Sequence, residues 1–130
     1  MLVQMLTEVE NVLQTDGRLR RWFRSEGEDL IVWFSENDSL WGFQFCYDRA
    51  KEEKALTWRQ DHGYSHERVD DGEGPGMDYK RTPILVQDSA FDASRVLDIF
   101  LNASANLPKV IVDFVADRIE GYYSDGASNT

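Results

Sequence analysis

The sequence predicts an α+β domain with an N-terminal helix, an antiparallel meander of about five to six strands, and two C-terminal helices packed on one face of the sheet. Apolar residues recur at helical intervals near the N-terminus, and from about Arg18 to Asp70 the period changes to two. Helical spacing returns after residue 88. Because helices and strands are segregated along the chain, the pattern favours an α+β fold.

Length and composition indicate a single folded unit. The chain has 130 residues, of which 42% are hydrophobic and 12% aromatic, which is enough apolar surface to form a core. We expect residues 1–123 to form one α+β domain. Residues 124–130 are small and polar, and we expect them to form a disordered tail.

The N-terminal and central elements follow from this periodicity. The first helix is predicted from the spacing of Leu2, Met5, Leu6, Val9 and Leu13, and strands are predicted near 18–25, 29–35, 40–48, 54–60 and 64–70. Short, turn-rich connections favour antiparallel pairing. One face of the third strand is expected to meet the helices, and it consists of Trp41, Phe43, Phe45 and Tyr47, extended on the next strand by Leu56 and Trp58.

Residues 71–82 form the longest irregular segment, and 83–86 is a short apolar run that fits a last edge strand. Asp88 or Ser89 is expected to cap a helix, and Pro108 stands where a second helix would start. The first of these helices is predicted to turn inward Phe91, Val96, Leu97, Phe100 and Leu101. The second is predicted to end or fray at Gly121 and to turn inward Val110, Ile111, Phe114, Val115, Arg118, Ile119 and Tyr122.

Several classes of protein are disfavoured by what the sequence contains. Cys46 is the single cysteine, which excludes an internal disulfide, and its aromatic neighbours favour a packed, inert thiol. The N-terminal stretch has no basic region typical of a secretion signal, and no apolar run has the length of a membrane span. We therefore expect a cytoplasmic protein without membrane association, and no residue pattern calls for a cofactor.

One polar cluster contains candidate catalytic or ligand-binding residues beside the 71–82 segment: His62, His66, Asp70, Asp71 and Glu73. Imidazoles next to carboxylates suit acid–base chemistry or a divalent metal. Two strand residues four positions apart lie about 13 Å from each other, too far to share one ion, so no metal site is predicted. A small enzyme or ligand binder that uses this cluster is the alternative function.

A second cluster contains candidate binding residues on the first strands. Arg20, Trp22 and Arg24 share one face of a strand, and Trp33 joins them on the exposed side if Phe23, Val32 and Phe34 point inward. Such a surface suits phosphate or an unpaired base. Acidic residues on the neighbouring strand offer a simpler role as cross-strand partners, and the net charge makes nucleic acid an unlikely ligand.

Charge decides which function the sequence favours. Lys and Arg total 14 against 24 Asp and Glu, which gives a formal net charge of −10, and the HExxH, GxSxG and CxxC patterns are absent. We expect a non-catalytic acidic interaction module, such as a chaperone, an immunity-type inhibitor or a regulatory subunit, that binds a basic protein partner. The sequence leaves open whether the chain is an enzyme. A homodimer is also expected, because an open meander leaves strand edges to cover.

Overall fold

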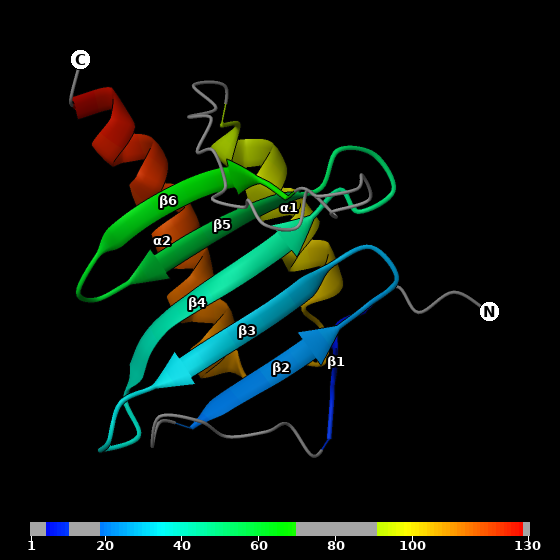
Figure 1. Cartoon of the computed structure of the whole chain (residues 1–130), viewed down its shortest axis with the longest axis vertical. Helices are drawn as coiled ribbons and strands as arrows, with labels where there is room; N and C mark the ends of the chain where they lie inside the picture. Colours follow the sequence, from blue (N-terminus) through cyan, green and yellow to red (C-terminus); the bar gives the residue numbers. More distant parts are fainter. Residues whose placement is uncertain (1–4, 11–18, 70–90, 129–130) are drawn as a thin grey trace, which may run out of the picture.

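The computed structural model describes residues 5–10, 19–69 and 91–128, with side chains described as far as residue 122. Six strands form one antiparallel sheet in which each strand pairs with its sequence neighbours (Figure 1). The predicted meander is therefore confirmed. The strands are β1 (Thr7–Glu8), β2 (Arg20–Arg24), β3 (Asp29–Phe34), β4 (Leu40–Tyr47), β5 (Lys54–Arg59) and β6 (Gly63–Arg68).

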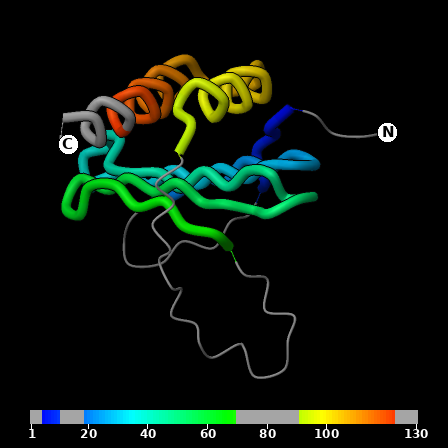
Figure 2. The backbone as a smooth tube through the Cα atoms, turned by 90° about the horizontal axis from the view of Figure 1, so that it is seen from above, coloured from blue at the N-terminus to red at the C-terminus, as the bar shows by residue number. Residues whose placement is uncertain are grey.

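Two helices, α1 (Ala93–Ala103) and α2 (Lys109–Ser128), lie side by side on the same face of the sheet (Figure 2). This confirms the predicted α+β class and its helix layer. Neither helix has the length and apolar character of a membrane span over the residues that the structure describes.

The core fills the space between the two layers, and it contains the predicted aromatic face of the sheet. Phe43, Phe45 and Tyr47 of β4 are almost fully buried, and Leu56 of β5 is fully buried beside them. The ring of Phe45 meets Phe100 of α1 edge-on at a centroid distance of 5.4 Å. The helices contribute mainly Val96, Phe100, Ile111, Val115 and Ile119.

The predicted N-terminal helix is wrong for the part of it that the structure describes, because Thr7–Glu8 is a strand paired with β2. Tertiary contacts outweigh the apolar spacing. Leu6 is fully buried and donates its backbone N–H to the Ala103 carbonyl at 2.8 Å. Arg21 donates to both carboxylate oxygens of Glu8 at 2.7 and 2.8 Å, and these hydrogen bonds lower the pKa of Glu8. The rest of the predicted helix lies outside the described residues.

A change of register also corrects the predicted face of β4. Trp33 pairs with Gly42 whereas Phe34 pairs with Leu40, so Trp41 is an extra residue at a β-bulge. Leu40, not Trp41, therefore packs with the core beside Phe34. Strict alternation across Trp41 predicts the wrong neighbour because a bulge interrupts the period of two.

The helices differ from prediction at their ends and on one side. Asp92, not Asp88 or Ser89, caps α1, because its carboxylate accepts the backbone N–H of Arg95 at 3.1 Å. Leu101 and Val110 are 45% and 64% exposed instead of pointing inward. α2 continues past Gly121 to Ser128 and so includes residues 124–128 of the predicted tail. The irregular segment 71–82, the edge strand at 83–86, Asp88 and Ser89 lie outside the described residues.

Candidate interaction surfaces

The face of the sheet opposite the helices, which we term the helix-free face, carries the candidate binding residues of β2 and β3. Its side chains follow from the strand register and form three rows across the sheet. The rows are Arg20, Trp33, Gly42, Arg59 and Gly63; then Trp22, Ile31, Gln44, Thr57 and Ser65; then Arg24, Asp29, Cys46, Ala55 and Glu67. Phe23 and Val32 point to the core, so Trp22 and Trp33 do lie on this opposite face.

Glycine shapes the first row. Gly42 separates Trp33 from Arg59, and a Cβ atom placed on Gly42 would lie only 3.2 Å from Cγ of Arg59. The stem of Arg59 thus lies against the glycine, and its guanidinium carbon reaches to 5.9 Å from the centroid of the Trp33 ring. A cation and an indole from strands that are not neighbours therefore meet across β4.

A second cation–indole contact lies within β2. The guanidinium carbon of Arg24 lies 4.8 Å from the centroid of the Trp22 ring. Arg24 also pairs with Asp29 at 3.1 Å, and the same carboxylate pairs with Arg49 at 2.7 Å. Cross-strand pairing is therefore present for Arg24, although Asp29 serves two arginines.

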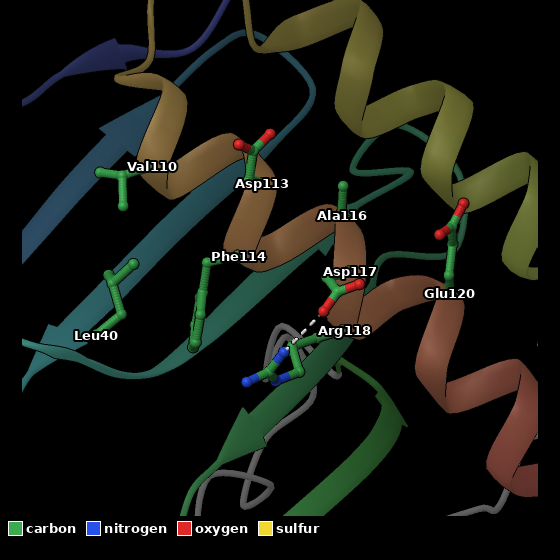
Figure 3. Close-up of a pocket in the computed structure, with 8 residues that line it drawn as sticks. All are labelled: Leu40, Val110, Asp113, Phe114, Ala116, Asp117, Arg118 and Glu120. Carbon is green, nitrogen blue, oxygen red and sulfur yellow. Dashed lines mark hydrogen bonds and ion pairs between the residues drawn. The ribbon is translucent and has the colours of Figure 1, made fainter.

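A shallow, open hollow of about 570 Å³ lies beside α2, and its lining also includes Leu40 of β4 (Figure 3). Figure 3 shows Leu40, Val110 and Phe114 at one end of the hollow and Glu120 at the other. Apolar side chains share its lining with three carboxylates and one guanidinium. The complete lining is Leu40, Val110, Asp113, Phe114, Ala116, Asp117, Arg118 and Glu120.

Ion pairs moderate the charge of this α2 hollow. Asp113 pairs with the exposed Lys109 at 2.8 Å, and Asp117 pairs with Arg118 at 3.2 Å. Glu120 has no ion pair within the described part of the chain. Over residues 91–122, five acidic residues stand against three basic ones, so the helix layer carries a surplus of negative charge.

Arg118 is held against the core rather than free to cover the hollow. Its guanidinium carbon lies 4.5 Å from the Trp58 ring centroid and 4.7 Å from that of Phe114. Its backbone carbonyl accepts the hydroxyl of Tyr64 at 2.8 Å, which ties α2 to β6.

The two histidines of the other candidate cluster do not converge. His62 is exposed in the turn between β5 and β6, where its Nδ1 lies 3.0 Å from Oδ1 of Asp61. His66 is buried in β6, and its Nε2 lies 2.6 Å from the hydroxyl of Tyr47. Asp70, Asp71 and Glu73 lie outside the described residues. Within the described part, no three metal-ligating side chains gather at one point.

Cys46 lies on the helix-free face, half-buried between Asp29 and Ala55 of the neighbouring strands. Burial raises the pKa of its thiol, which outweighs the opposing effect of a hydrogen bond from Gln44. A raised pKa leaves little thiolate at neutral pH, so the thiol has the chemistry of an inert group.

We compared the chain with known protein families, curated proteins and solved structures. No family model, no curated protein and no solved structure matches this chain.

Two features were not predicted from the sequence: the position of Arg59 beside Trp33, and the three acids of α2 that line the hollow, Asp113, Asp117 and Glu120. The alternation of β5 places Arg59 opposite Leu56 and Trp58, but only the register shows that it reaches Trp33. The acids of α2 recur at helical spacing, and this spacing could have predicted that they share one side of the helix.

Proposed function

We propose that this chain is a non-catalytic interaction module that binds a basic segment of a partner protein in the α2 hollow. The observation that carries the proposal is that apolar side chains and carboxylates line the same hollow beside α2, with the apolar ones gathered at one end. Val110 is 64% exposed there, a larger fraction than for any other large apolar side chain in the described residues. Its burial by a partner is favourable because apolar surface leaves water.

The apolar side chains and the carboxylates of the hollow would contribute differently to binding a partner. Contacts with Val110 and Phe114 would supply affinity, because buried apolar anchors dominate the energy of protein interfaces. Asp117 and Glu120 would set orientation and reject acidic competitors. The formal net charge of −10 supports the same preference at longer range, since it attracts basic segments and raises the rate of encounter.

The spacing of the acids defines the ligand more closely. Asp113, Asp117 and Glu120 follow one another at intervals of four and three residues on α2. The first and last are therefore about 10 Å apart along the helix axis. A partner helix with Lys or Arg at the same intervals, and an apolar residue beside them, matches the α2 hollow in charge and spacing.

The alternative of an enzyme or ligand binder rests on a cluster whose two histidines lie apart in the structure. His62 and His66 are separated, one in a turn and one in the core, and neither lines the hollow.

The test is a selection of displayed random peptides against the whole protein at low ionic strength. Peptides that enrich should carry Lys or Arg at helical intervals with an apolar residue between them. The affinity of the synthesised winner is then measured by calorimetry with Val110→Gln and Glu120→Gln. We expect Val110→Gln to weaken binding at least about tenfold, and Glu120→Gln to weaken it less and to reduce its salt dependence.

Two control variants match these changes outside the α2 hollow. Leu101→Gln replaces an exposed apolar side chain of α1, and Asp98→Asn removes an exposed carboxylate of the same helix. Both should bind like the wild type. Enriched peptides without basic residues, or a winner that binds Val110→Gln as tightly as the wild type, would overturn the proposal.

A homodimer through an uncovered strand edge is a separate proposal that rests on the meander topology. Sedimentation equilibrium over a range of protein concentrations tests it. A molar mass of 15.0 kDa at every concentration would exclude it.

A further inference from the structure

We propose that the helix-free face is the contact surface of a homodimer, in which two copies of this chain pack face to face about a two-fold axis. A closed two-fold interface requires a surface that complements itself. Arg59 and Glu67 meet this requirement, because they carry opposite charges on neighbouring strands of this face and neither has an ion pair in the described part of the chain. The interface is distinct from the strand-edge contact proposed above.

Arg59 supplies the cation. Its guanidinium makes no ion pair with a described residue, and its Nε is shielded from solvent without a hydrogen-bond acceptor. Shielded donors without an acceptor are uncommon in native proteins. The ring of Trp33 and the bare backbone of Gly42 restrain the side chain before a second copy arrives. Restraint of this kind lowers the entropy lost when the planar guanidinium takes a carboxylate.

Glu67 supplies the anion. It is half-buried and pairs in register with Ala55, four residues along β6 from the position opposite Arg59. With one strand spacing added, the two charged residues are about 14 Å apart on the face. A two-fold axis that crosses the strands midway between them places Arg59 of each copy over Glu67 of the other. One pair of residues thus provides two charge-assisted contacts in the dimer.

The charge balance of this face favours a second copy, although the chain as a whole repels one. The formal net charge of −10 opposes self-association at long range. Apart from Arg20, which already has a partner, the rows of the face hold two arginines and two acids. Two such faces therefore meet without a surplus of either sign. The helix layer, with its surplus of acids, has no such balance.

The middle of the face supplies the apolar contact. Trp22, Ile31 and Trp33 are half-buried in the single chain, and tryptophan and arginine often dominate the energy of protein interfaces. The face measures about 24 Å across β2 to β6 and about 20 Å along the strands, or about 500 Å² per copy and about 1,000 Å² in total. This area lies at the lower limit for a specific interface, so the dimer should be weak, with a dissociation constant on the order of micromolar.

The test is sedimentation equilibrium of the full chain at physiological salt over a range of concentrations. Arg59→Glu and Glu67→Arg each bring like charges together twice in the dimer, and each should weaken self-association at least about tenfold. An equimolar mixture of the two variants should associate again, because both contacts between unlike copies then join opposite charges. The double variant Arg59→Glu/Glu67→Arg should dimerise like the wild type for the same reason.

Arg68→Glu is the matched control, since it makes the same charge change on the helix side of the sheet. It should leave the dissociation constant of the dimer unchanged. Ile31→Arg separates the face from a strand edge, because β3 lies inside the sheet. It should abolish association through the face and leave an edge contact intact. Circular dichroism and thermal unfolding check that each variant is folded.

A wild-type molar mass of 15.0 kDa at every concentration would overturn this homodimer. Equal association of the wild type, Arg59→Glu and Glu67→Arg would also overturn it, as would a mixture of the two variants that associates no better than either alone. Association that survives Ile31→Arg would assign the contact to a strand edge instead. None of these results bears on the α2 hollow, which is tested with its own peptides.

Discussion

The hydroxyl of Tyr47 lies 2.6 Å from Nε2 of His66, and both side chains are buried on the helix side of the sheet. Their rings stack at a centroid distance of 6.0 Å, and Phe91 packs edge-on against the imidazole at 4.8 Å. The candidate histidine is therefore part of the core, joined to a tyrosine two strands away.

This pair predicts that Tyr47→Phe destabilises the protein although it preserves the ring. The substitution removes the hydrogen bond between the Tyr47 hydroxyl and a buried imidazole nitrogen, which costs about 1–3 kcal/mol. Urea unfolding followed by tryptophan fluorescence measures the change. Tyr64→Phe, which loses a part-buried hydrogen bond to the Arg118 carbonyl, should cost less. An unchanged free energy of unfolding for Tyr47→Phe would contradict the prediction.

Gly42→Ala is predicted to be destabilising, because the added Cβ would lie 2.6 Å from the Trp58 carbonyl oxygen. Backbone must shift to accept it, which costs about 1–3 kcal/mol. Gly27→Ala is the control, since nothing lies within 4 Å of a Cβ at that position. Denaturant midpoints compare the stability of the two variants. Equal midpoints would contradict the prediction, because they would show that β5 moves away from Gly42 at no cost.

Asp48→Asn tests the ion pair that joins β4 to α1. Arg95 donates to both oxygens of Asp48 at 2.7 and 3.0 Å, and these bonds lower the pKa of Asp48 below 3.8. Because this pKa is lowered, the ionised Asp48 carboxylate stabilises the folded state above pH 3.8. This stabilisation is lost as the pH falls through the folded-state pKa. Because Arg95 is partly exposed, we expect a loss of about 0.5–1 kcal/mol at neutral pH.

The pH dependence separates this effect from a simple loss of packing. The stability difference between wild type and Asp48→Asn should shrink in acid, as the wild-type carboxylate becomes protonated. Asp113→Asn breaks a pair whose side chains are 85% and 63% exposed, so it should change stability little at any pH. A difference for Asp48→Asn that persists unchanged in acid would assign the effect to packing.

Cys46 is predicted to react slowly with iodoacetamide in the folded protein. Burial raises the pKa of the thiol above 9.0, so thiolate is scarce at mildly alkaline pH. The reaction should be severalfold faster in denaturing urea. Because the pKa is raised, the neutral thiol stabilises the fold below pH 9.0, and this stabilisation is lost as the pH rises through the folded-state pKa. Equal rates in the folded and unfolded protein would contradict this account.

The strands were predictable because each has a clear period of two between turn residues. Phe23, Leu30, Phe43 and Leu56 occupy the core as the alternation predicts. The bulge at Trp41 was not predictable, since nothing in the local pattern marks the extra residue. The strand at Thr7 was missed because the contacts of Leu6 with α1 and of Glu8 with β2 are remote in sequence.

The candidate surfaces were predictable in part. The placement of Trp22 and Trp33 followed from the inward direction of Phe23 and Val32. The contact between Arg59 and Trp33 depends on how β3, β4 and β5 pair, and a single sequence does not specify that register. Val110 was predicted to face the core because its spacing matches the apolar stripe of the helix. Spacing alone does not show how wide the buried part of the stripe is, and Val110 lies outside it.

The two-layer architecture has a mechanical consequence for any complex that the chain forms. The two helices lie on one side of the sheet, so the sheet stands between α2 and the arginines of β2 and β5 on its other face (Figure 2). A partner held in the proposed α2 hollow would therefore be separated by the whole thickness of the sheet from the side chains of Trp22, Trp33 and Arg59.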